Sequence, residues 1–473
     1  MITIQHEALH RKITFGSEKA KRLRKPVLVS YSLEAEQPIN PLAFFAAGHS
    51  VFPGERSFWS DPSRELALVG AGESHIVRPS PAYRFKDAEK QWKQLIETAV
   101  YDGDTAAEGT GPLMIGGFSF DPLKPVTKLW NAFEHTKLTV PTFLLTIVKG
   151  NFYLTINIMV DHTADADSLY EKAIGDQESL FSSLTAEYPV SFPAHVYTEE
   201  IAPDHWKDSV AKLAEEVREG VIEKVVTARE LRLYGSGSFS PDAVLGRLLE
   251  QQPQSYIFAF ESGTDCFVGA TPERLIKRSG TEVLSTCLAG TIARGSTHRE
   301  DEQLGKELLQ DEKNLHEHAL VVKMIKQAME AGCDHVEVPD SPALYKVRDI
   351  QHLYTPVKGK AKSDATLLSM VEKLHPTPAL GGFPQEQAME KIRTEEIMDR
   401  GWYAAPIGWM DVRGNGEFAV GIRSGLLQGD EASLFAGCGI VGDSDPECEY
   451  VETKMKFKPM LSALGGTLHD NSE

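Results

Sequence analysis

The sequence predicts an α+β fold, in which strands follow one another in runs and helices are grouped between the runs. One run contains a hairpin, because the apolar segments Thr142–Val148 and Phe152–Ile158 are joined by the turn signal Lys149-Gly150-Asn151. A second run of short strands occupies Ile407–Leu434. The helical segments do not alternate singly with the strands, which argues against a strict βαβ order.

Residues 1–190 are predicted to form an α/β half that serves as a scaffold. Val27–Leu33 is typical of a strand, and Asp165–Leu184 has helical periodicity. We find no chemical motif in this half. The Pro- and aromatic-containing stretch Tyr188–Pro203 is the predicted boundary, although the two halves can also form one continuous structural unit.

The predicted catalytic half spans residues 200–462. It opens with an amphipathic helix, Asp204–Glu219, which ends at Gly220. A long helix and a capped terminal helix are predicted further on, the latter starting at Ser444 or Asp445 with Pro446 in its first turn. The remaining elements of this half are, in order, the strands Val221–Arg229, Phe258–Phe260, Phe267–Gly269 and Leu284–Thr286 and the long helix Glu300–Ala331.

The composition is that of a soluble globular protein, since 41% of the 473 residues are hydrophobic and 25% are charged. No apolar run is long enough to span a bilayer, and the N-terminus has no apolar signal segment, so we expect a cytoplasmic protein without a membrane partner. The five cysteines are scattered and form no Cys-x-x-Cys pair, which disfavours disulfides and zinc.

The formal net charge of −19 argues against a nucleic-acid or anionic-membrane partner. If the substrate is a small anion, the site has to supply positive charge locally. Arginine, lysine, a helix N-terminus or a bound metal ion can each do so.

The terminal helix carries the most informative side chains. Glu449 and Glu452 are three residues apart and Lys456 is four further on, so all three share one face. Two neighbouring carboxylates repel each other unless a cation lies between them or one is protonated. Mg²⁺ is typically held by one or two carboxylates with water and an anionic substrate. The alternative is a solvated helix with an ordinary Glu–Lys pair.

Three further charged residues lie where burial is expected. Lys224 alternates with apolar residues on its strand, so it has to reach solvent, pair with an acid, or lose its proton as a general base does. Glu273 lies in a tight turn at a strand end, where burial would raise its pKa and make it a general acid. Glu317 shares a helix face with apolar side chains and needs a cation or a proton. The alternatives are a structural ion pair for Lys224 and a solvent-exposed turn acid for Glu273.

Two more residues are candidates for the site, and one glycine motif suggests a function that the rest of the sequence excludes. His352 alternates with apolar residues in a short strand, where a hydrogen-bonded core histidine is the default. Arg423 lies on another strand between small residues, which suits bidentate capture of a carboxylate but also an ordinary surface arginine. The Gly-x-Gly-x-x-Gly pattern at 437–442 matches a dinucleotide fingerprint, but only one helix follows it and the βαβ unit has no room. We expect these glycines instead to let backbone amides approach an anion.

Residues 200–460 resemble the chorismate-utilising enzymes through ten short elements that occur in the order typical of that family. Each element is weak alone, but ten in order are specific. The elements are Lys224–Arg229, Gly269–Glu273, Leu288–Thr291, His316–His318, Gln351–Leu353, His375–Gly382, Gly401–Gly408, Ile422–Gly425, Ala436–Ile440 and Ser444–Lys456.

Single positions distinguish the activities within this family. The ammonia-using anthranilate and aminodeoxychorismate synthases carry glutamine where this chain has Lys224, and the latter tend to carry a nucleophilic lysine where it has Ala270. Salicylate synthases share the lysine but usually have threonine at the position of Ala379. The resemblance therefore implies the branch that converts chorismate to isochorismate, with salicylate synthase as the alternative. The long N-terminal half is more similar to the menaquinone-pathway form than to the shorter siderophore-pathway form.

The resemblance also implies large antiparallel β-sheets that form a core with helices packed outside. Lys224 would be the base that activates water at C2 of chorismate, and Glu273 the acid at the C4 hydroxyl. Mg²⁺ would be held by Glu317 and Glu452, with Glu449 direct or through water. No glutaminase subunit is expected, because the nucleophile is water. A non-catalytic chorismate sensor would be expected to lack the base or the acid. The implied substrate-binding residues are Gly290, His352, Ala379, Leu380, Arg423, Gly437, Gly439 and Lys456.

Overall fold

The computed structural model describes residues 6–103, 106–184, 192–348 and 350–466. The helices of these residues are α1 (His6–Leu23), α2 (Pro41–Val51), α3 (Arg84–Thr98), α4 (Ala166–Ser183), α5 (Pro203–Arg218), α6 (Pro241–Gln251), α7 (His298–Leu308), α8 (Glu312–Gly332), α9 (Leu367–Leu374), α10 (Gln385–Glu395) and α11 (Pro446–Leu464), with short 3₁₀ turns at Pro81–Tyr83 and Lys128–Trp130. The strands are β1 (Val27–Glu34), β2 (Arg56–Ser60), β3 (Leu66–Val77), β4 (Val100–Gly103), β5 (Leu113–Phe118), β6 (Thr136–Val148), β7 (Asn151–Val160), β8 (Val196–Glu200), β9 (Lys224–Gly235), β10 (Tyr256–Ser262), β11 (Asp265–Thr271), β12 (Arg274–Ser279), β13 (Glu282–Ala293), β14 (Cys333–Glu337), β15 (Ala343–Lys346), β16 (Ile350–Ala361), β17 (Gly382–Phe383), β18 (Pro406–Asp411), β19 (Gly416–Val420), β20 (Ser424–Gln428) and β21 (Glu431–Ile440).

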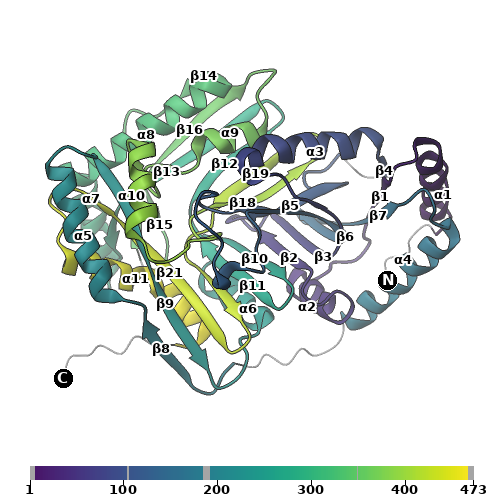
Figure 1. Ribbon diagram of the computed structural model, residues 1–473, viewed down its shortest axis with the longest axis horizontal. Helices are drawn as coiled ribbons and strands as arrows, with labels where there is room; N and C mark the ends of the chain where they lie inside the picture. The colour runs from purple at the N-terminus through teal and green to yellow at the C-terminus, as the bar shows by residue number, and fades with distance from the viewer. Residues whose placement is uncertain (1–5, 104–105, 185–191, 349, 467–473) are drawn as a thin grey trace.

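Two series of antiparallel strands run outward from the central pair β3–β6 (Figure 1). The first, which we call the β9 arm, passes from β3 through β2, β10, β11, β20 and β21 to β9. The second, the β16 arm, passes from β6 through β5, β18, β19, β12 and β13 to β16. Among the described strands only β1 and β4 pair in parallel. The predicted α+β fold with large antiparallel sheets and outer helices is confirmed.

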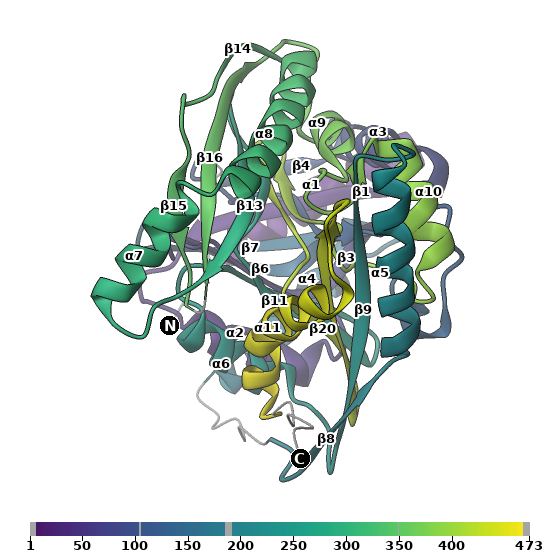
Figure 2. The same ribbon diagram turned by 90° about the vertical axis from the view of Figure 1, so that its left-hand side faces the viewer.

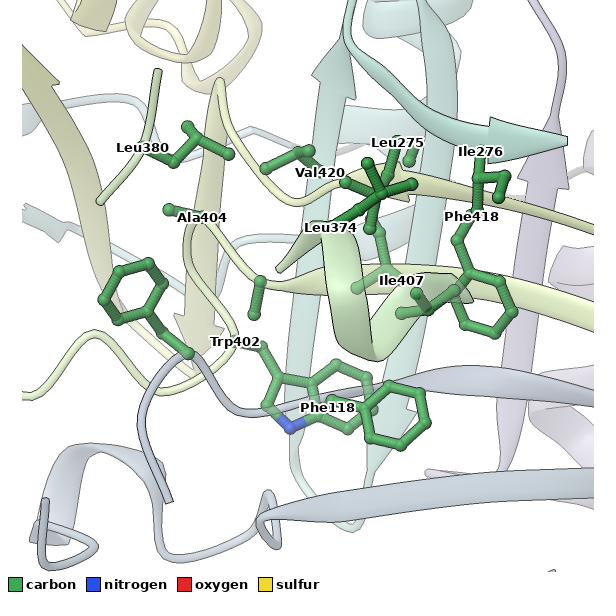
Figure 3. Close-up of a cluster of buried hydrophobic side chains, with 14 of the residues drawn as sticks. Phe118, Leu275, Ile276, Leu374, Leu380, Trp402, Ala404, Ile407, Phe418 and Val420 are labelled. Atoms are coloured by element: carbon green, nitrogen blue, oxygen red, sulfur yellow. The ribbon is translucent and has the colours of Figure 1, made fainter. Parts of the chain in front are cut away.

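One of two hydrophobic cores lies between the two arms, and the other lies between the strands and the helices α1, α2, α4, α6 and α11. Figure 3 shows apolar side chains from β12, β18, β19 and α9 meeting the rings of Phe118 and Trp402, and both rings are almost fully buried. Helices cover the outside: α8 packs on β13 and β16, α5 on β9, and α2 on β3. Figure 2 shows that β9 with α5 lies opposite β13 and β16 with α8, and that α11 lies between them. The far ends of the two arms are therefore brought together.

Several predicted elements form for the reasons that the sequence indicates. The β6–β7 hairpin turns on Lys149 and Gly150, both with positive φ, which matches the twist of the strands that they join. Helix α11 begins at Pro446, and the carboxylate of Asp445 accepts hydrogen bonds from the backbone N–H groups of Glu447 and Cys448. Part of the predicted boundary Tyr188–Pro203 lies outside the described residues.

Two predictions are wrong. The long helix Glu300–Ala331 is two helices, α7 and α8, because Asp311 leaves the helical conformation and caps α8 by accepting a hydrogen bond from the Asn314 N–H. Arg423 does not lie on a strand: it joins β19 to β20 in the left-handed conformation, with φ of 51°. A turn therefore aims this side chain, and strand alternation does not.

Strands from the first 190 residues pair directly with strands from the rest of the chain. β2 pairs with β10, and β5 pairs with β18. The division into a half of residues 1–190 and a half of residues 200–462 remains a prediction about folding units. None of the described helices combines the length and apolar character that crossing a membrane requires.

Candidate active site

A cavity of about 300 Å³ lies where the ends of the two arms meet. Its walls come from β9 and β21 on one side, from β13, β16 and α8 on the other, and from α11. All thirteen residues predicted to act in catalysis or to bind substrate or metal line this cavity: Lys224, Glu273, Gly290, Glu317, His352, Ala379, Leu380, Arg423, Gly437, Gly439, Glu449, Glu452 and Lys456. Residues spread from position 224 to position 456 are thus brought to one place.

Lys224 is the first residue of β9, and only 2% of it is exposed. Its ammonium group forms an ion pair with Glu317 of α8. His318, the residue after Glu317, fixes helix α8 against β13 and β16. Its ring forms hydrogen bonds with the Thr355 hydroxyl (2.7 Å) and the Ala289 carbonyl (3.0 Å). Of the three fates expected for a buried lysine, this structure shows pairing with an acid at the cavity wall.

Gly439 of β21 makes room for the Lys224 side chain. A Cβ atom on Gly439 would lie 2.6 Å from Lys224 Cε and 3.1 Å from its Nζ. The close contact is with the end of a flexible chain, so the fold can accept it, but the amine cannot remain in place. Glycine at position 439 thus leaves the space that the Lys224 amine occupies.

Gly439→Ala is therefore expected to fold normally and to displace the Lys224 amine. We expect turnover of the protein's substrate to fall by about tenfold or more, because a catalytic group moved by about 1 Å loses much of its effect. Gly175→Ala is the matched control, since a Cβ atom on Gly175 meets nothing within 4 Å on the outer helix α4. Thermal unfolding and steady-state kinetics measured on both variants check this, and equal activity would contradict it.

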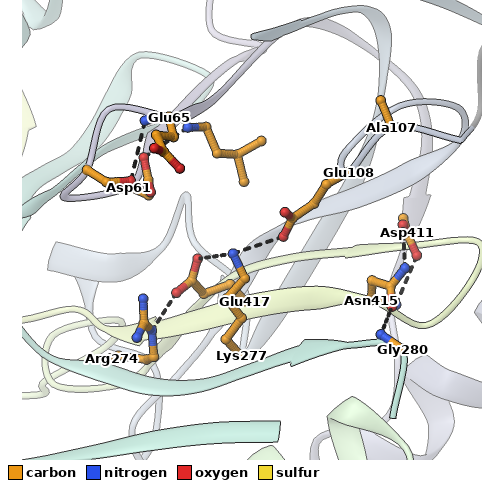
Figure 4. A network of polar contacts seen from close by, with 12 residues as sticks. Asp61, Glu65, Ala107, Glu108, Arg274, Lys277, Gly280, Asp411, Asn415 and Glu417 are labelled. Atoms are coloured by element: carbon orange, nitrogen blue, oxygen red, sulfur yellow. Dashed lines mark hydrogen bonds and ion pairs between the residues drawn. The ribbon is translucent and has the colours of Figure 1, made fainter. Parts of the chain in front are cut away.

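Glu273 lies in the turn between β11 and β12 and is 6% exposed. Burial raises the pKa of its carboxyl group to about 7, although the nearby charges of Arg423, Lys224 and Lys456 act in the opposite direction. The next residue anchors the turn: Arg274 Nε donates to the fully buried Glu417 (2.6 Å), which also accepts from Tyr256 (2.6 Å). Figure 4 shows the Arg274–Glu417 contact extending to Lys277. A carboxyl with this pKa can be protonated at neutral pH and donate a proton.

The acidic face of α11 also points to the cavity. Lys456 pairs with Glu452 (2.6 Å) and donates to the Gly437 carbonyl (2.8 Å), while Glu449 accepts from the Ser444 hydroxyl (2.7 Å). Lys456 lowers the pKa of Glu452. Burial is the main cause that raises the pKa of Glu449, and the charge of Glu452 raises it further. The two carboxylates are therefore close enough to repel each other.

These acids suit a hard divalent cation chemically, because carboxylate oxygens are the ligands that Mg²⁺ takes and a cation would relieve the Glu449–Glu452 repulsion. In the part of the chain that the structure describes, no group of three or more His, Cys, Asp or Glu side chains is arranged to hold a metal ion. Glu317 is paired with Lys224 and Glu452 with Lys456, so a metal would compete with two lysines. The magnesium site remains a prediction.

The cavity also contains residues to which the sequence motifs assign no role. Arg400 donates to the carbonyls of Leu380 (3.0 Å) and Val226 (2.8 Å) and pairs with Glu396, so it joins the Ala379–Leu380 wall to β9. Two of its partners are main-chain carbonyls from distant segments, and no local pattern predicts those contacts. Thr291, within an element already noted, lies 2.8 Å from the His352 ring. Further lining residues without an assigned role include Lys313, Asn314 and Tyr403.

The cavity can bind a small anion despite the charge of −19 on the whole chain. Five cationic side chains line it together with four carboxyl groups, and Glu273 carries little charge below pH 7. At an effective dielectric constant of about 20, a pair of unit charges 4 Å apart is worth roughly 4 kcal/mol. The arrangement places a buried amine and a buried carboxylic acid around one anion-binding cavity.

Known proteins match the chain over nearly its full length. The family model for chorismate binding enzymes matches residues 14–465. The isochorismate synthase MenF of Bacillus subtilis is 44% identical over 98% of this chain and 99% of its own length, and the salicylate biosynthesis isochorismate synthase of Pseudomonas aeruginosa is 38% identical over 95% and 93%. The solved structure of MenF, the menaquinone-specific isochorismate synthase from Escherichia coli, has the same fold, with a TM-score of 0.78 and 23% identity over 96% of this chain and 100% of that one.

Proposed function

This chain belongs to the chorismate-binding enzyme family, and from that premise we propose that it is an isochorismate synthase, an isomerase that converts chorismate reversibly to isochorismate. The observation that carries the proposal is the pair Lys224 and Glu273, buried side chains on the walls of one cavity. The first can take a proton and the second can give one. A chorismate sensor needs neither.

The reaction assigned to this pair removes the hydroxyl group at C4 and adds a hydroxyl group from water at C2. Lys224 pairs with Glu317 as an ammonium group, so as the base it first has to lose a proton; its amine then takes a proton from the water that attacks C2 of the ring. The ring double bonds shift, and the C4–O bond breaks as Glu273 donates its proton to the departing hydroxyl, which leaves as water. One water is consumed and one is released, no covalent intermediate forms, and the proton taken up by Lys224 balances the proton lost by Glu273.

Positive charge at the cavity walls accounts for binding of a dianion. Arg423 binds the enolpyruvyl carboxylate, with help from backbone amides near Gly437 and Gly439, and Lys456 and His352 orient the ring. Ala379 and Leu380 form the wall that Arg400 holds against β9. Water is the nucleophile, so this assignment includes no glutaminase partner.

Mg²⁺ belongs to the proposal as a cofactor held by Glu317, Glu452 and Glu449. When bound, it would neutralise the ring carboxylate of chorismate. The support for it is the chemistry of the donors: three carboxylates that line one cavity, two of which repel each other.

Glu452→Gln is expected to raise the Mg²⁺ concentration needed for half-maximal activity by about tenfold and to be rescued partly by excess Mg²⁺, because an amide is a weaker ligand than a carboxylate. Glu447→Gln is the control, since Glu447 lies on the same helix but pairs with Lys207 at the surface. Magnesium titration of both variants checks this. An unchanged Mg²⁺ requirement in Glu452→Gln would remove this residue from the metal site.

We assign the enzyme to menaquinone biosynthesis. The support is the match over nearly the full length of both chains with the isochorismate synthase MenF of Bacillus subtilis, which shares its name with the menaquinone-specific isochorismate synthase of Escherichia coli, a protein of the same fold. The relative named for salicylate biosynthesis is also matched over nearly its whole length but is less identical, at 38% against 44%.

The test is to incubate the pure protein with chorismate, with and without Mg²⁺, and to separate the products by chromatography. Isochorismate that appears only with Mg²⁺ is the expected result. Salicylate and pyruvate as the main products would move the protein to the salicylate synthase branch and would show that Ala379 is a poor guide. Chorismate that binds without turnover would favour a sensor.

A further inference from the structure

Arg229 is a buried cation to which the proposed reaction gives no role. It is the last residue of the first family element, Lys224–Arg229, and is 3% exposed. Lys224 and Val226 line the cavity, and alternation along β9 places Arg229, five residues after Lys224, on the opposite face of the sheet. Arginine is rarely buried unless it is paired, so its partners indicate what it does there.

Helix α11 supplies three of the side chains that contact Arg229. The Arg229 Nε donates a hydrogen bond to the Thr453 hydroxyl (2.7 Å), and Nη1 pairs with Glu200 of β8 (2.7 Å). The guanidinium group lies over the rings of Tyr450 and Phe457, with Cζ 4.4 Å and 5.0 Å from the ring centroids. Thr453, Tyr450 and Phe457 all belong to α11, so Arg229 attaches this helix to β9.

The contacts with Arg229 and the cavity lining occupy neighbouring faces of α11. Successive residues of an α-helix are turned by about 100°. Each α11 residue that contacts Arg229 comes directly after one that lines the cavity: Tyr450 after Glu449, Thr453 after Glu452, and Phe457 after Lys456. The face that Arg229 holds therefore determines the direction in which the acidic face points.

Further hydrogen bonds reinforce the contact between α11 and Arg229. The Tyr450 hydroxyl donates to Glu200 (2.6 Å), the ion-pair partner of Arg229, and the Thr453 hydroxyl donates to the Tyr450 carbonyl (2.7 Å). Thr453 is fully buried. Because water does not reach Thr453 or Arg229, a turn of α11 about its axis would leave a hydrogen bond of the buried guanidinium unmade, which is costly.

We propose that Arg229 is a positioning residue, which fixes the rotation of α11 about its axis and so aims the Glu452 carboxylate and the Lys456 ammonium into the cavity. The functions of Glu452 and Lys456 rest on the proposed function, whereas the hold of Arg229 on α11 does not. The hydrogen bond from Lys456 to the Gly437 carbonyl (2.8 Å) reports the rotation, because it joins the cavity face of α11 to β21.

Two substitutions break the contact from its two sides. Arg229→Lys keeps the charge but has one ammonium group in place of the planar fork, so it cannot bind Thr453 and Glu200 as arginine does. Thr453→Val keeps the shape but removes the hydroxyl. In crystal structures of both variants we expect α11 to be turned about its axis and the Lys456–Gly437 hydrogen bond to be lost. Thr453→Val decides the question if Arg229→Lys does not fold, and an unchanged α11 in its structure would overturn the proposal.

Metal binding without turnover separates positioning from stability. Mn²⁺ takes the same oxygen ligands as Mg²⁺, and the free ion is measured by electron paramagnetic resonance. We expect Thr453→Val to weaken Mn²⁺ binding by about tenfold, the lower end of what the loss of an outer partner of a metal ligand costs, and Thr453→Ser to recover most of it. The same affinity in Thr453→Val as in the wild-type protein would refute the positioning role.

Thr146→Val is the matched control. Thr146 of β6 is also fully buried, and its hydroxyl donates to the Gly109 carbonyl (2.6 Å), away from the cavity. This variant should unfold at a lower temperature, as Thr453→Val does, but keep its Mn²⁺ affinity, and an equal loss of affinity in both would refute the positioning role. Wild-type protein that binds no Mn²⁺ and forms no isochorismate would refute the metal site and the proposed function, and the crystal structures would then decide the positioning role alone.

Discussion

Replacing Lys224 with alanine is expected to lower kcat for isochorismate formation by about 10²–10⁴-fold, the usual contribution of a positioned general base. Lys224 is 2% exposed, so bulk water does not readily substitute for its amine. Chorismate binding in the presence of Mg²⁺ should persist, because Arg423 and Lys456 remain on the cavity wall. Product chromatography gives kcat, and calorimetric titration gives the dissociation constant for chorismate.

Lys326→Ala is the matched control for this experiment. Lys326 lies on α8, as the partner of Lys224 does. Its side chain is 47% exposed, however, and its ion pair with Glu330 is loose, at 3.9 Å. Its removal should leave kcat unchanged. If Lys224→Ala loses chorismate binding together with turnover, Lys224 is part of the binding site, and its assignment as the base fails.

Replacing Glu273 with glutamine is expected to lower kcat by a similar factor of about 10²–10⁴, because glutamine keeps the shape of the side chain but has no proton to give to the leaving hydroxyl. The pH dependence identifies the group. Burial raises the pKa of Glu273 to about 7, so its acid form is lost as the pH rises through that value. Wild-type kcat/KM should therefore fall above about pH 7, and Glu273→Gln should lack this alkaline limb.

A measurement of stability separates the loss of chemistry from the loss of fold. Because burial raises the pKa of Glu273 from 4.5 to about 7, the folded state loses stability relative to the unfolded state as the pH rises between these two values, and the loss is complete above about pH 7. Glu273→Gln removes this ionisable group and should unfold at the same or a higher temperature at pH 8. An alkaline limb that survives in Glu273→Gln would assign the titration to another group.

The sequence alone determined the cap of α11, the turn of the β6–β7 hairpin and which residues are candidates for the site. Asp445 and Pro446 begin α11, and Lys149-Gly150 closes the β6–β7 hairpin, because capping and turn formation depend on residues a few positions apart. The family resemblance named the candidate site residues, and all of them line one cavity.

The three-dimensional fold decided what each of these side chains meets. Lys224 and Glu317 face each other because β9 ends one series of strands, and α8 packs on β13 and β16 at the end of the other series that begins at the same central pair. The raised pKa of Glu273 arises from burial by the whole fold, and the left-handed turn at Arg423 replaced an expected strand. Thr291 reaches His352 only because a bulge shifts the register of two strands. The sequence by itself determined which groups are present, whereas their partners, protonation and direction depend on contacts between distant segments, which only the folded chain brings within reach.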